Sequence, residues 1–261
     1  FPGSRHDGVF GLWYGKGPGV DRSCDALKHG NYQGTSEYGG VLVLAGDDPG
    51  ARSSSIAHES EPALVHMGIP VLNPSTVQDY LDLGLLGFAM SRFSGCWIGF
   101  KCVTDTVESA ASVEVGEQRA VPVLPGDFEI PDSPRRGAPV GSEEALYHER
   151  LPAVQAFARA NGMDRVVIRP EKARIGIVTT GKAYLDVRQA LDELGLDERR
   201  CLEEGLGVYK VALSWPLEPR TATEFAGALD HVLVVEEKRP LIEDQLRALL
   251  YDRGDRPSLE G

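Results

Sequence analysis

The chain has 261 residues, of which 42% are hydrophobic and 25% charged, the ordinary balance of a globular protein with one large or two medium domains. Its 39 acidic residues outnumber its 27 basic ones and give a formal net charge of −12, which argues against non-specific nucleic-acid binding, because that binding needs Lys and Arg to neutralise phosphates. No apolar run approaches the roughly 20 residues that span a bilayer and no signal peptide is visible, so we expect a cytoplasmic chain without a membrane partner.

The first 120 residues alternate strand-like and helix-like patterns with short links. Apolar runs predict strands at 9–14, 41–45, 69–72 and 96–103, and amphipathic patterns predict helices at 21–29, 61–67 and 76–93. The run VLVLA at 41–45 is continuously apolar, which is typical of a strand buried on both faces. This alternation predicts a parallel α/β sheet with a ligand site at the carboxyl ends of its strands.

A proline-rich stretch separates this region from a second one. Residues 121–140 carry five of the 17 prolines and are predicted to form an extended linker, followed by a helix at 142–161. Further strands are predicted at 174–179, 208–213 and 231–235, and further helices at 183–196, 222–229 and 241–251. We therefore divide the chain into residues 1–120, a linker and helix at 121–163, and a smaller α/β unit at 164–261.

The four cysteines do not form a metal-binding pattern. Cys24, Cys96, Cys102 and Cys201 include no CxxC pair and do not cluster with histidines. We interpret them as buried free thiols of a reducing cytoplasm. An iron–sulfur cluster within this chain is not expected, because four thiolates would have to converge on it.

The turn between the first strand and the first helix is rich in glycine and contains a lysine. It reads YGKGPGVDR, with Lys16, Gly17, Pro18 and Gly19 at its centre. A Walker loop needs GxxxxGK[ST], which is absent, and the dinucleotide pattern GxGxxG fails because Arg22 takes the place of the last glycine. Two interpretations remain open: helix amides that favour an anion, or a tight turn that allows close backbone packing.

The loop after the buried strand, GDDPGARSSSIAHESE at 46–61, is crowded with acidic, hydroxyl and imidazole groups. Asp47, Asp48, His58 and Glu59 have the chemistry for metal ligation or acid–base work. A Ser–His–acid triad is also conceivable, but the GxSxG turn is absent. Because loops at this edge of α/β sheets concentrate function, we expect the loop to have a functional role.

Two later turns carry weaker signals. Residues 179–182 (TTGK) follow a predicted strand and are interpreted as a structural turn, with anion binding at the next helix as the alternative. Residues 236–238 (EEK) end the last long strand and are expected to be solvated, with a subunit interface as the alternative.

These segments resemble a known family. The blocks that carry the resemblance are GVFGLWYGKGPGVDRS, GGVLVLAGDD, YLDLGLLGFAMSRFSGCWIGFKCVTDTVESAASV, GIVTTGKAYLDVRQALDELG and LVVEEKRPLIEDQL. Together they are similar to the long, fused form of indolepyruvate ferredoxin oxidoreductase, one of the thiamine-diphosphate-dependent 2-oxoacid:ferredoxin oxidoreductases. The similarity runs over nearly the whole chain and is spread over separated blocks.

The resemblance implies a fold and a reaction. Residues 1–120 would be the C-terminal part of a pyrimidine-binding domain, and residues 164–261 a transketolase-C-terminal-like domain. The parent enzyme would oxidatively decarboxylate an aryl 2-oxoacid to an acyl-CoA and pass electrons to ferredoxin. It would use thiamine diphosphate with Mg²⁺ and [4Fe–4S] clusters. The partners implied are the remaining domains or subunits, ferredoxin, coenzyme A and the 2-oxoacid, in a homo-oligomer such as a dimer.

The resemblance also implies what this chain lacks and where its site lies. The acidic residue that contacts the aminopyrimidine ring should precede Phe1, and the GDG…N magnesium motif is absent, since the GDD at 46–48 is only a partial match and lies in the wrong domain. We expect the chain alone to bind no cofactor fully. His58 and Glu59 are the candidate catalytic residues. The candidate cofactor-binding residues are Lys16, Gly17, Pro18, Gly19, Asp47, Asp48, Ser53, Ser54 and Ser55. A non-catalytic assembly fragment, or the same chemistry on another 2-oxoacid such as pyruvate, remain the alternatives.

Overall fold

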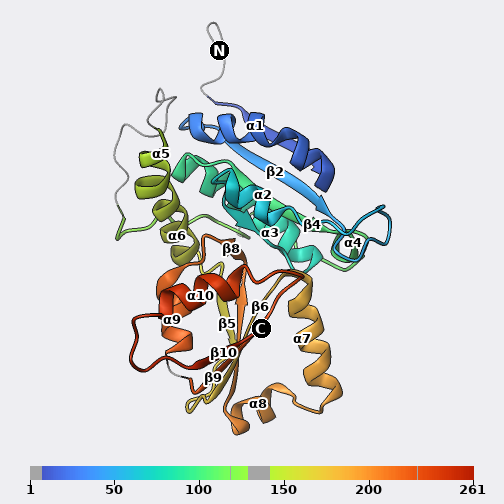
Figure 1. The fold of residues 1–261 in the computed structure, drawn as a ribbon, viewed down its shortest axis with the longest axis vertical. Coiled ribbons are helices and arrows are strands. Elements are labelled where there is room, and N and C mark those ends of the chain that lie inside the picture. Colours follow the sequence, from blue (N-terminus) through green and yellow to red (C-terminus); the bar gives the residue numbers. More distant parts are fainter. Residues whose placement is uncertain (1–7, 118, 129–141, 228) are drawn as a thin grey trace, which may run out of the picture.

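The alternating strands and helices fold into two α/β units stacked along the long axis of the molecule (Figure 1). The structure is a computed structural model and describes residues 8–117, 119–128, 142–227 and 229–261. No helix in these ranges is long and apolar enough to cross a membrane. The predicted linker residues 129–141 lie outside the described residues.

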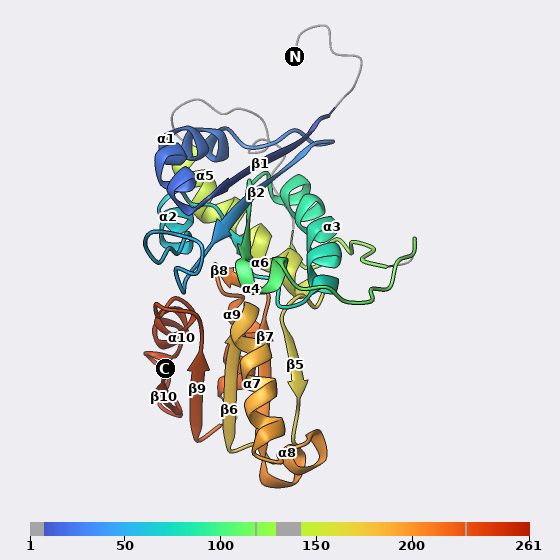
Figure 2. The same cartoon turned by 90° about the vertical axis from the view of Figure 1, so that its right-hand side faces the viewer.

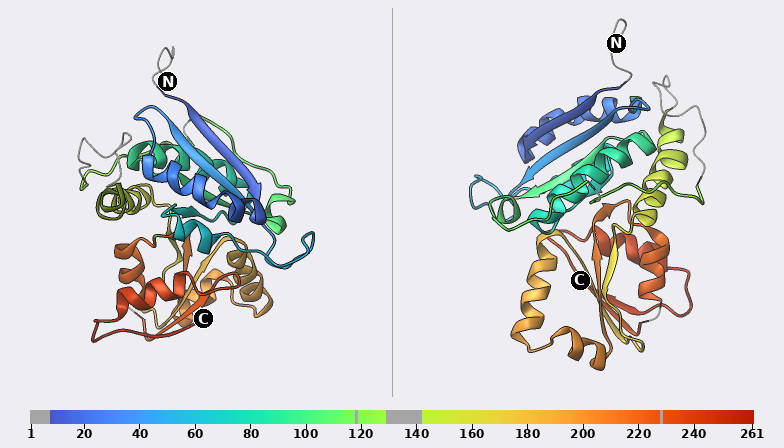
Figure 3. Two further views of the ribbon diagram at one scale, coloured as in Figure 1. Left: turned by 45° about the horizontal axis from the view of Figure 1, so that its top comes forward. Right: turned by 180° about the vertical axis from the view of Figure 1, so that it is seen from behind.

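The first unit carries four strands that alternate with helices. Its elements are β1 (Phe10–Lys16), α1 (Gly17–Gln33), β2 (Gly40–Asp47), α2 (Glu61–His66), β3 (Val71–Leu72), α3 (Val77–Ser94), β4 (Ile98–Val103) and α4 (Thr104–Val107). The sheet order is β1-β2-β4-β3-β8, in which β8 (Leu213–Trp215) comes from the second half of the chain, and the first three neighbouring pairs are parallel. β1 is the outermost strand (Figure 3). The predicted parallel α/β sheet is confirmed.

A helical segment connects the units and runs beside the first one (Figure 3, right). It consists of α5 (Ser142–Ala145), a π-helical stretch η1 (Leu146–Arg150) and α6 (Leu151–Ala160). The buried face of α6 includes Val154 and Phe157, which join the same hydrophobic core as Leu86 and Met90 of α3. The predicted helix at 142–161 is therefore present, and it buries its apolar face against the first unit.

The second unit is a mixed sheet flanked by helices. Its elements are β5 (Arg165–Ile168), β6 (Ile175–Thr180), α7 (Gly181–Glu193), α8 (Glu198–Glu204), β7 (Leu206–Val211), β8 (Leu213–Trp215), α9 (Pro219–Ala226), β9 (His231–Val235), α10 (Ile242–Leu250) and β10 (Ser258–Glu260). The order is β10-β9-β6-β7-β5, with β5 antiparallel to β7 and the other pairs parallel. β8 leaves this unit and pairs antiparallel with β3, so one strand ties the two sheets together.

Helices cover both faces of each sheet. α1 and α2 lie on one side of the first sheet and α3 on the other (Figure 2). α3 begins with a capping box, in which Thr76 accepts a hydrogen bond from the amide of Asp79 while the Asp79 carboxylate accepts the amide of Thr76. A Cβ on Gly87 of this helix would lie only 3.0 Å from Leu42 and 3.2 Å from Leu72, so glycine allows the helix to pack closely on the strands.

The carboxyl ends of the two parallel sheets face each other. Asp79, which follows β3, binds Lys210 near the end of β7 at 2.6 Å. Glu59, which follows β2, binds Arg239 beyond the end of β9 at 3.0 Å. The edge at which α/β sheets place their ligands is thus, in this chain, also the junction between the units.

Candidate functional site

The glycine-rich turn and the acidic loop meet at the carboxyl ends of β1 and β2. A Cβ on Gly17 would lie 1.9 Å from Nδ1 of His58, so the imidazole ring fills the space beside the first residue of α1. Of the two interpretations of this turn, the geometry supports close packing, because the occupant of the turn is a side chain of the protein itself. Lys16 is exposed and caps α1 through its backbone only.

His58 lies between two carboxylates. Its Nδ1 is 3.4 Å from Oδ1 of Asp47, and its Nε2 is 3.0 Å from Oδ2 of Asp21 on α1. Asp47 is 1% exposed, and its side chain also accepts hydrogen bonds from the backbone amide and the hydroxyl of Ser60. The three side chains of Asp47, His58 and Asp21 form a line from the buried end of β2 to the surface.

The environment shifts the proton affinities along this line. Burial raises the pKa of Asp47 above its ordinary value, although the hydrogen bonds from Ser60 oppose the shift. Burial lowers the pKa of His58, but the hydrogen bonds to the carboxylates of Asp21 and Asp47 outweigh it, and the net shift is upward. The arrangement can hold a proton on the imidazole and exchange it between a buried and an exposed carboxylate.

Asp48 organises the loop that follows. Its two oxygens accept the backbone amides of Arg52 and Ser53, and these hydrogen bonds hold its pKa below the ordinary value. Ser53 also donates its hydroxyl to Asp48 and lines a 390 Å³ pocket beside α4, whereas Ser55 is exposed. The side chain of Ser54 also contributes to lowering the pKa of Asp48. The Asp48 carboxylate is therefore occupied by its own loop.

Glu59 and Glu61 connect the loop to the second unit. Glu59 is buried and forms an ion pair with the exposed side chain of Arg239. Burial raises the pKa of Glu59. Glu61 accepts a hydrogen bond from Nζ of Lys101 at 2.7 Å and from the hydroxyl of Ser214 at 2.7 Å. All of these except Arg239 are less than 10% exposed, so the network spans the junction between β4 and β8 as a buried group of charges.

Sequence reasoning missed Glu61, Lys101 and the pair Asp79–Lys210. A signal was present in each case, because Lys101 and Lys210 are single lysines inside otherwise apolar strands, CWIGFKCV and VYKVAL. A lysine buried in a strand requires a carboxylate partner. The partner of Lys101 depended on how α2 packs within the first unit, and the partner of Lys210 on how the two units pack.

The expectation that residues 236–238 are solvated is wrong for Glu236. Its carboxylate accepts the backbone amides of Ile242 and Glu243 at 2.8 and 3.0 Å and so caps the first turn of α10. Burial raises the pKa of Glu236 against these hydrogen bonds. At residues 179–182, Thr180 ends β6 and Gly181 begins α7 without an intervening loop, with Asn73 packed against Gly181.

The described residues do not fit the diphosphate end of thiamine diphosphate. The space beside Gly17 is filled by His58, and the Asp48 oxygens are taken by loop amides. The same ranges contain no group of three or more His, Cys, Asp or Glu side chains that could hold a metal ion. The four cysteines are free, with Cys96 and Cys201 buried and Cys24 and Cys102 half-buried.

Comparison with known proteins shows what the chain is similar to. Residues 165–261 match the model of the indolepyruvate oxidoreductase domain. The chain is 27% identical to the indolepyruvate oxidoreductase subunit IorA of Pyrococcus abyssi over 256 residues, with 93% of this chain and 37% of the relative covered. The IorA subunit of Methanothermobacter marburgensis is also 27% identical, with 95% and 38% covered. The resemblance to indolepyruvate ferredoxin oxidoreductase is confirmed. The chain spans somewhat more than a third of the length of these relatives.

Solved structures share the fold. A 2-oxoglutarate:ferredoxin oxidoreductase from Magnetococcus marinus, with 2-oxoglutarate, coenzyme A and succinyl-CoA bound, superposes with a TM-score of 0.60 at 15% identity over 98% of this chain and 50% of that one. A split-gene transketolase, described as an inactive β4 tetramer, superposes with a TM-score of 0.51 at 15% identity, and the match covers 97% of this chain and 65% of the transketolase chain. The expected fold of a pyrimidine-type sheet followed by a transketolase-C-terminal-like unit is confirmed.

Proposed function

We propose that this chain is part of a thiamine-diphosphate-dependent enzyme that oxidatively decarboxylates an aryl 2-oxoacid, such as indolepyruvate, to an acyl-CoA and passes electrons to ferredoxin. The observation that carries the proposal is that the similarity to IorA subunits extends over both units and the segment between them. Residues 1–120 then form the C-terminal part of the pyrimidine-binding domain, residues 121–163 the linker and helix, and residues 164–261 the transketolase-C-terminal-like domain.

The partners follow from the same proposal. The remaining domains or subunits hold the diphosphate with Mg²⁺ and the [4Fe–4S] clusters, since the described residues offer no fit for them. Coenzyme A, ferredoxin and the 2-oxoacid meet the assembled enzyme, which we propose is a cytoplasmic homo-oligomer.

His58 is the residue of this chain best placed for acid–base work near the edge of the sheet. Its side chain is 11% exposed and connects buried Asp47 with Asp21, which is 57% exposed. Proton transfer by a positioned side chain is worth about 10²–10⁴ in rate. Glu59 has its carboxylate in an ion pair with Arg239, so we propose that it positions the loop and the second unit.

The test uses the assembled oxidoreductase that contains this chain. Indolepyruvate-dependent reduction of a viologen dye in the presence of coenzyme A is measured anaerobically for the wild type, His58→Gln and His29→Gln. His29 is the matched control, because it lies on α1 with its side chain 73% exposed beside Asp25. We expect kcat to fall about a hundredfold for His58→Gln and to stay unchanged for His29→Gln.

Two other outcomes separate the alternatives. A non-catalytic assembly role would be supported by two results together. The His58→Gln variant would turn over at the wild-type rate, and the oxidoreductase would fail to assemble only when this chain is removed. Faster turnover of pyruvate than of indolepyruvate would keep the chemistry and change the substrate. Calorimetry of the chain alone with thiamine diphosphate and Mg²⁺ is expected to show no tight binding, since the turn at Gly17 is filled.

A further inference from the structure

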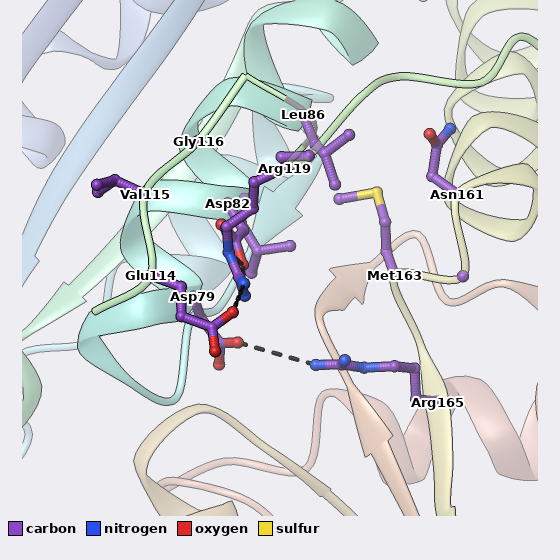
Figure 4. Close-up of a pocket in the computed structure, with 13 residues that line it drawn as sticks. Asp79, Asp82, Leu86, Glu114, Val115, Gly116, Arg119, Asn161, Met163 and Arg165 are labelled. Carbon is purple, nitrogen blue, oxygen red and sulfur yellow. Dashed lines mark hydrogen bonds and ion pairs between the residues drawn. The ribbon is translucent and has the colours of Figure 1, made fainter. Parts of the chain in front are cut away.

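A pocket of 520 Å³ is lined in part by residues of α3 (Figure 4). This helix covers the face of the first sheet opposite α1 (Figure 2). Residues 114–116 and 119–120 pass over α3 and form one wall, and the start of β5 forms the other. This volume is within the range of about 300–1,000 Å³ that small-molecule sites occupy. The pocket contains none of the residues discussed around His58.

The carboxylates of the pocket already have cations. Asp82 accepts hydrogen bonds from Nε and Nη2 of Arg119, at 2.9 and 2.8 Å, and Glu114 accepts one from Nη1 at 2.5 Å. Oδ2 of Asp79 lies 2.6 Å from Nζ of Lys210. The same oxygen accepts the backbone amides of Ser75 and Thr76 just before α3. The acidic side of the pocket is therefore neutralised by the protein.

Arg165 is less well paired. Its Nη2 lies 3.9 Å from Oδ1 of Asp79, beyond hydrogen-bond distance, and among the described residues its guanidinium makes no hydrogen bond to a protein acceptor. The side chain is 58% exposed and points into the pocket toward Asp79 (Figure 4). A planar guanidinium with free donors is the group that best recognises a carboxylate or a phosphate.

The remaining wall of the pocket is apolar. Leu83, Leu86 and Met163 line it and are at most 9% exposed, and the side chains of Leu86 and Met163 lie side by side in Figure 4. Arg165 stands at the opposite end, two residues after Met163 along the chain. An occupant that satisfies both ends has one anionic group and an apolar body.

The charges also decide between anions. Arg119, Lys210 and Arg165 together only balance the charges of Asp79, Asp82 and Glu114, so the second negative charge of a dianion would find no further cation in this pocket. We propose that this pocket is a binding site for a monocarboxylate with an aryl or branched apolar body, held by Arg165 and separate from the residues around His58. The inference does not rest on the proposed function, because its test measures binding and not turnover.

Phenylacetate is the probe, and its binding to the chain is measured by ligand-observed NMR and calorimetry. We expect a dissociation constant on the order of 1 mM for the wild type. Arg165→Gln should weaken binding about tenfold, the effect of losing a charge-assisted hydrogen bond. Arg174→Gln is the matched control, since Arg174 is 74% exposed and pairs with Asp230 elsewhere.

A second variant tests the sign of the electrostatics. Glu114 is 86% exposed, so Glu114→Gln should fold normally, remove one repelling charge and strengthen phenylacetate binding severalfold. Phenylacetamide and inorganic phosphate should bind at least about tenfold more weakly than phenylacetate. Equal binding by Arg165→Gln, equal binding of phosphate, or no binding of phenylacetate to the folded wild type would overturn the proposal.

Discussion

Asp164 should make the stability of this chain fall as the pH rises. It lies just before β5 and is 8% exposed. Its Oδ1 accepts the amides of Ala212 and Leu213 at 2.7 and 3.0 Å, where the chain crosses from β7 to β8, and its Oδ2 has no partner among the described residues. Burial raises its pKa from 3.8 to about 6, against the effect of the two amides.

The magnitude follows from this shift. Between pH 3.8 and about 6 the folded chain keeps the proton on Asp164 and the unfolded chain does not, so the free energy of unfolding decreases as the pH rises through this window and then levels off. Two pKa units correspond to about 3 kcal/mol. Asp164→Asn keeps an acceptor for the amides of Ala212 and Leu213 but cannot titrate, so this pH-dependent contribution disappears.

Urea unfolding followed by circular dichroism at pH 4, 5, 6 and 7 measures the effect. The free energy of unfolding of Asp164→Asn, minus that of the wild type, should increase by about 2 kcal/mol from pH 4 to pH 7, because the unfolded wild type has already lost part of the proton at pH 4. Asp192→Asn, at an exposed position of α7, should show no such trend. A difference between Asp164→Asn and the wild type that does not change with pH would refute the reasoning.

Three further predictions concern the junction and the edge. Lys101→Met leaves the Glu61 carboxylate buried without its cation and should lower the free energy of unfolding by about 3–5 kcal/mol. Adding Glu61→Gln to this variant should recover part of the loss. If the two substitutions lower the free energy of unfolding additively, the two side chains are not paired. Gly17→Ala places a Cβ 1.9 Å from Nδ1 of His58, so it should cost about 1–3 kcal/mol in urea unfolding and shift the NMR signals of that ring. An NMR titration should show that Asp21→Asn lowers the pKa of His58, because the Asp21 hydrogen bond helps raise it against burial; the stability from this pair is complete below about pH 6.5 and is lost as the pH rises through the raised pKa.

Some elements could not be predicted from the sequence. β8 and β10 have three residues each, too few for a periodic pattern, and β8 forms only because β3 offers its edge. The predicted strand at 208–213 covers what the structure divides into β7 and β8, since the chain leaves one sheet and joins the other at Ala212. Such a change of sheet is set by distant packing and leaves no local signal.

The candidate site shows the same limit. The sequence indicated that the turn at 16–19 and the loop at 46–61 lie at one edge, because both follow strands of a predicted parallel sheet. It did not indicate that the His58 ring fills the space beside Gly17, or that Asp48 is taken up by its own loop. These contacts depend on how the irregular loop at 46–61 packs against the start of α1, which the sequence pattern does not specify.

The sequence by itself determined the alternating elements, the parallel sheets and the family resemblance, because hydrophobic periodicity and separated blocks of similar residues are local properties of the chain. The tertiary structure alone decided which charges meet. Lys210 of β7 binds Asp79 of α3 because the carboxyl ends of the two sheets face each other across the junction, whereas Lys101 of β4 binds Glu61 of α2 through packing within the first unit. The same packing leaves Nη2 of Arg165 3.9 Å from Oδ1 of Asp79, whose Oδ2 binds Lys210, so that Arg165 has no hydrogen-bonded partner in the part of the chain that the structure describes.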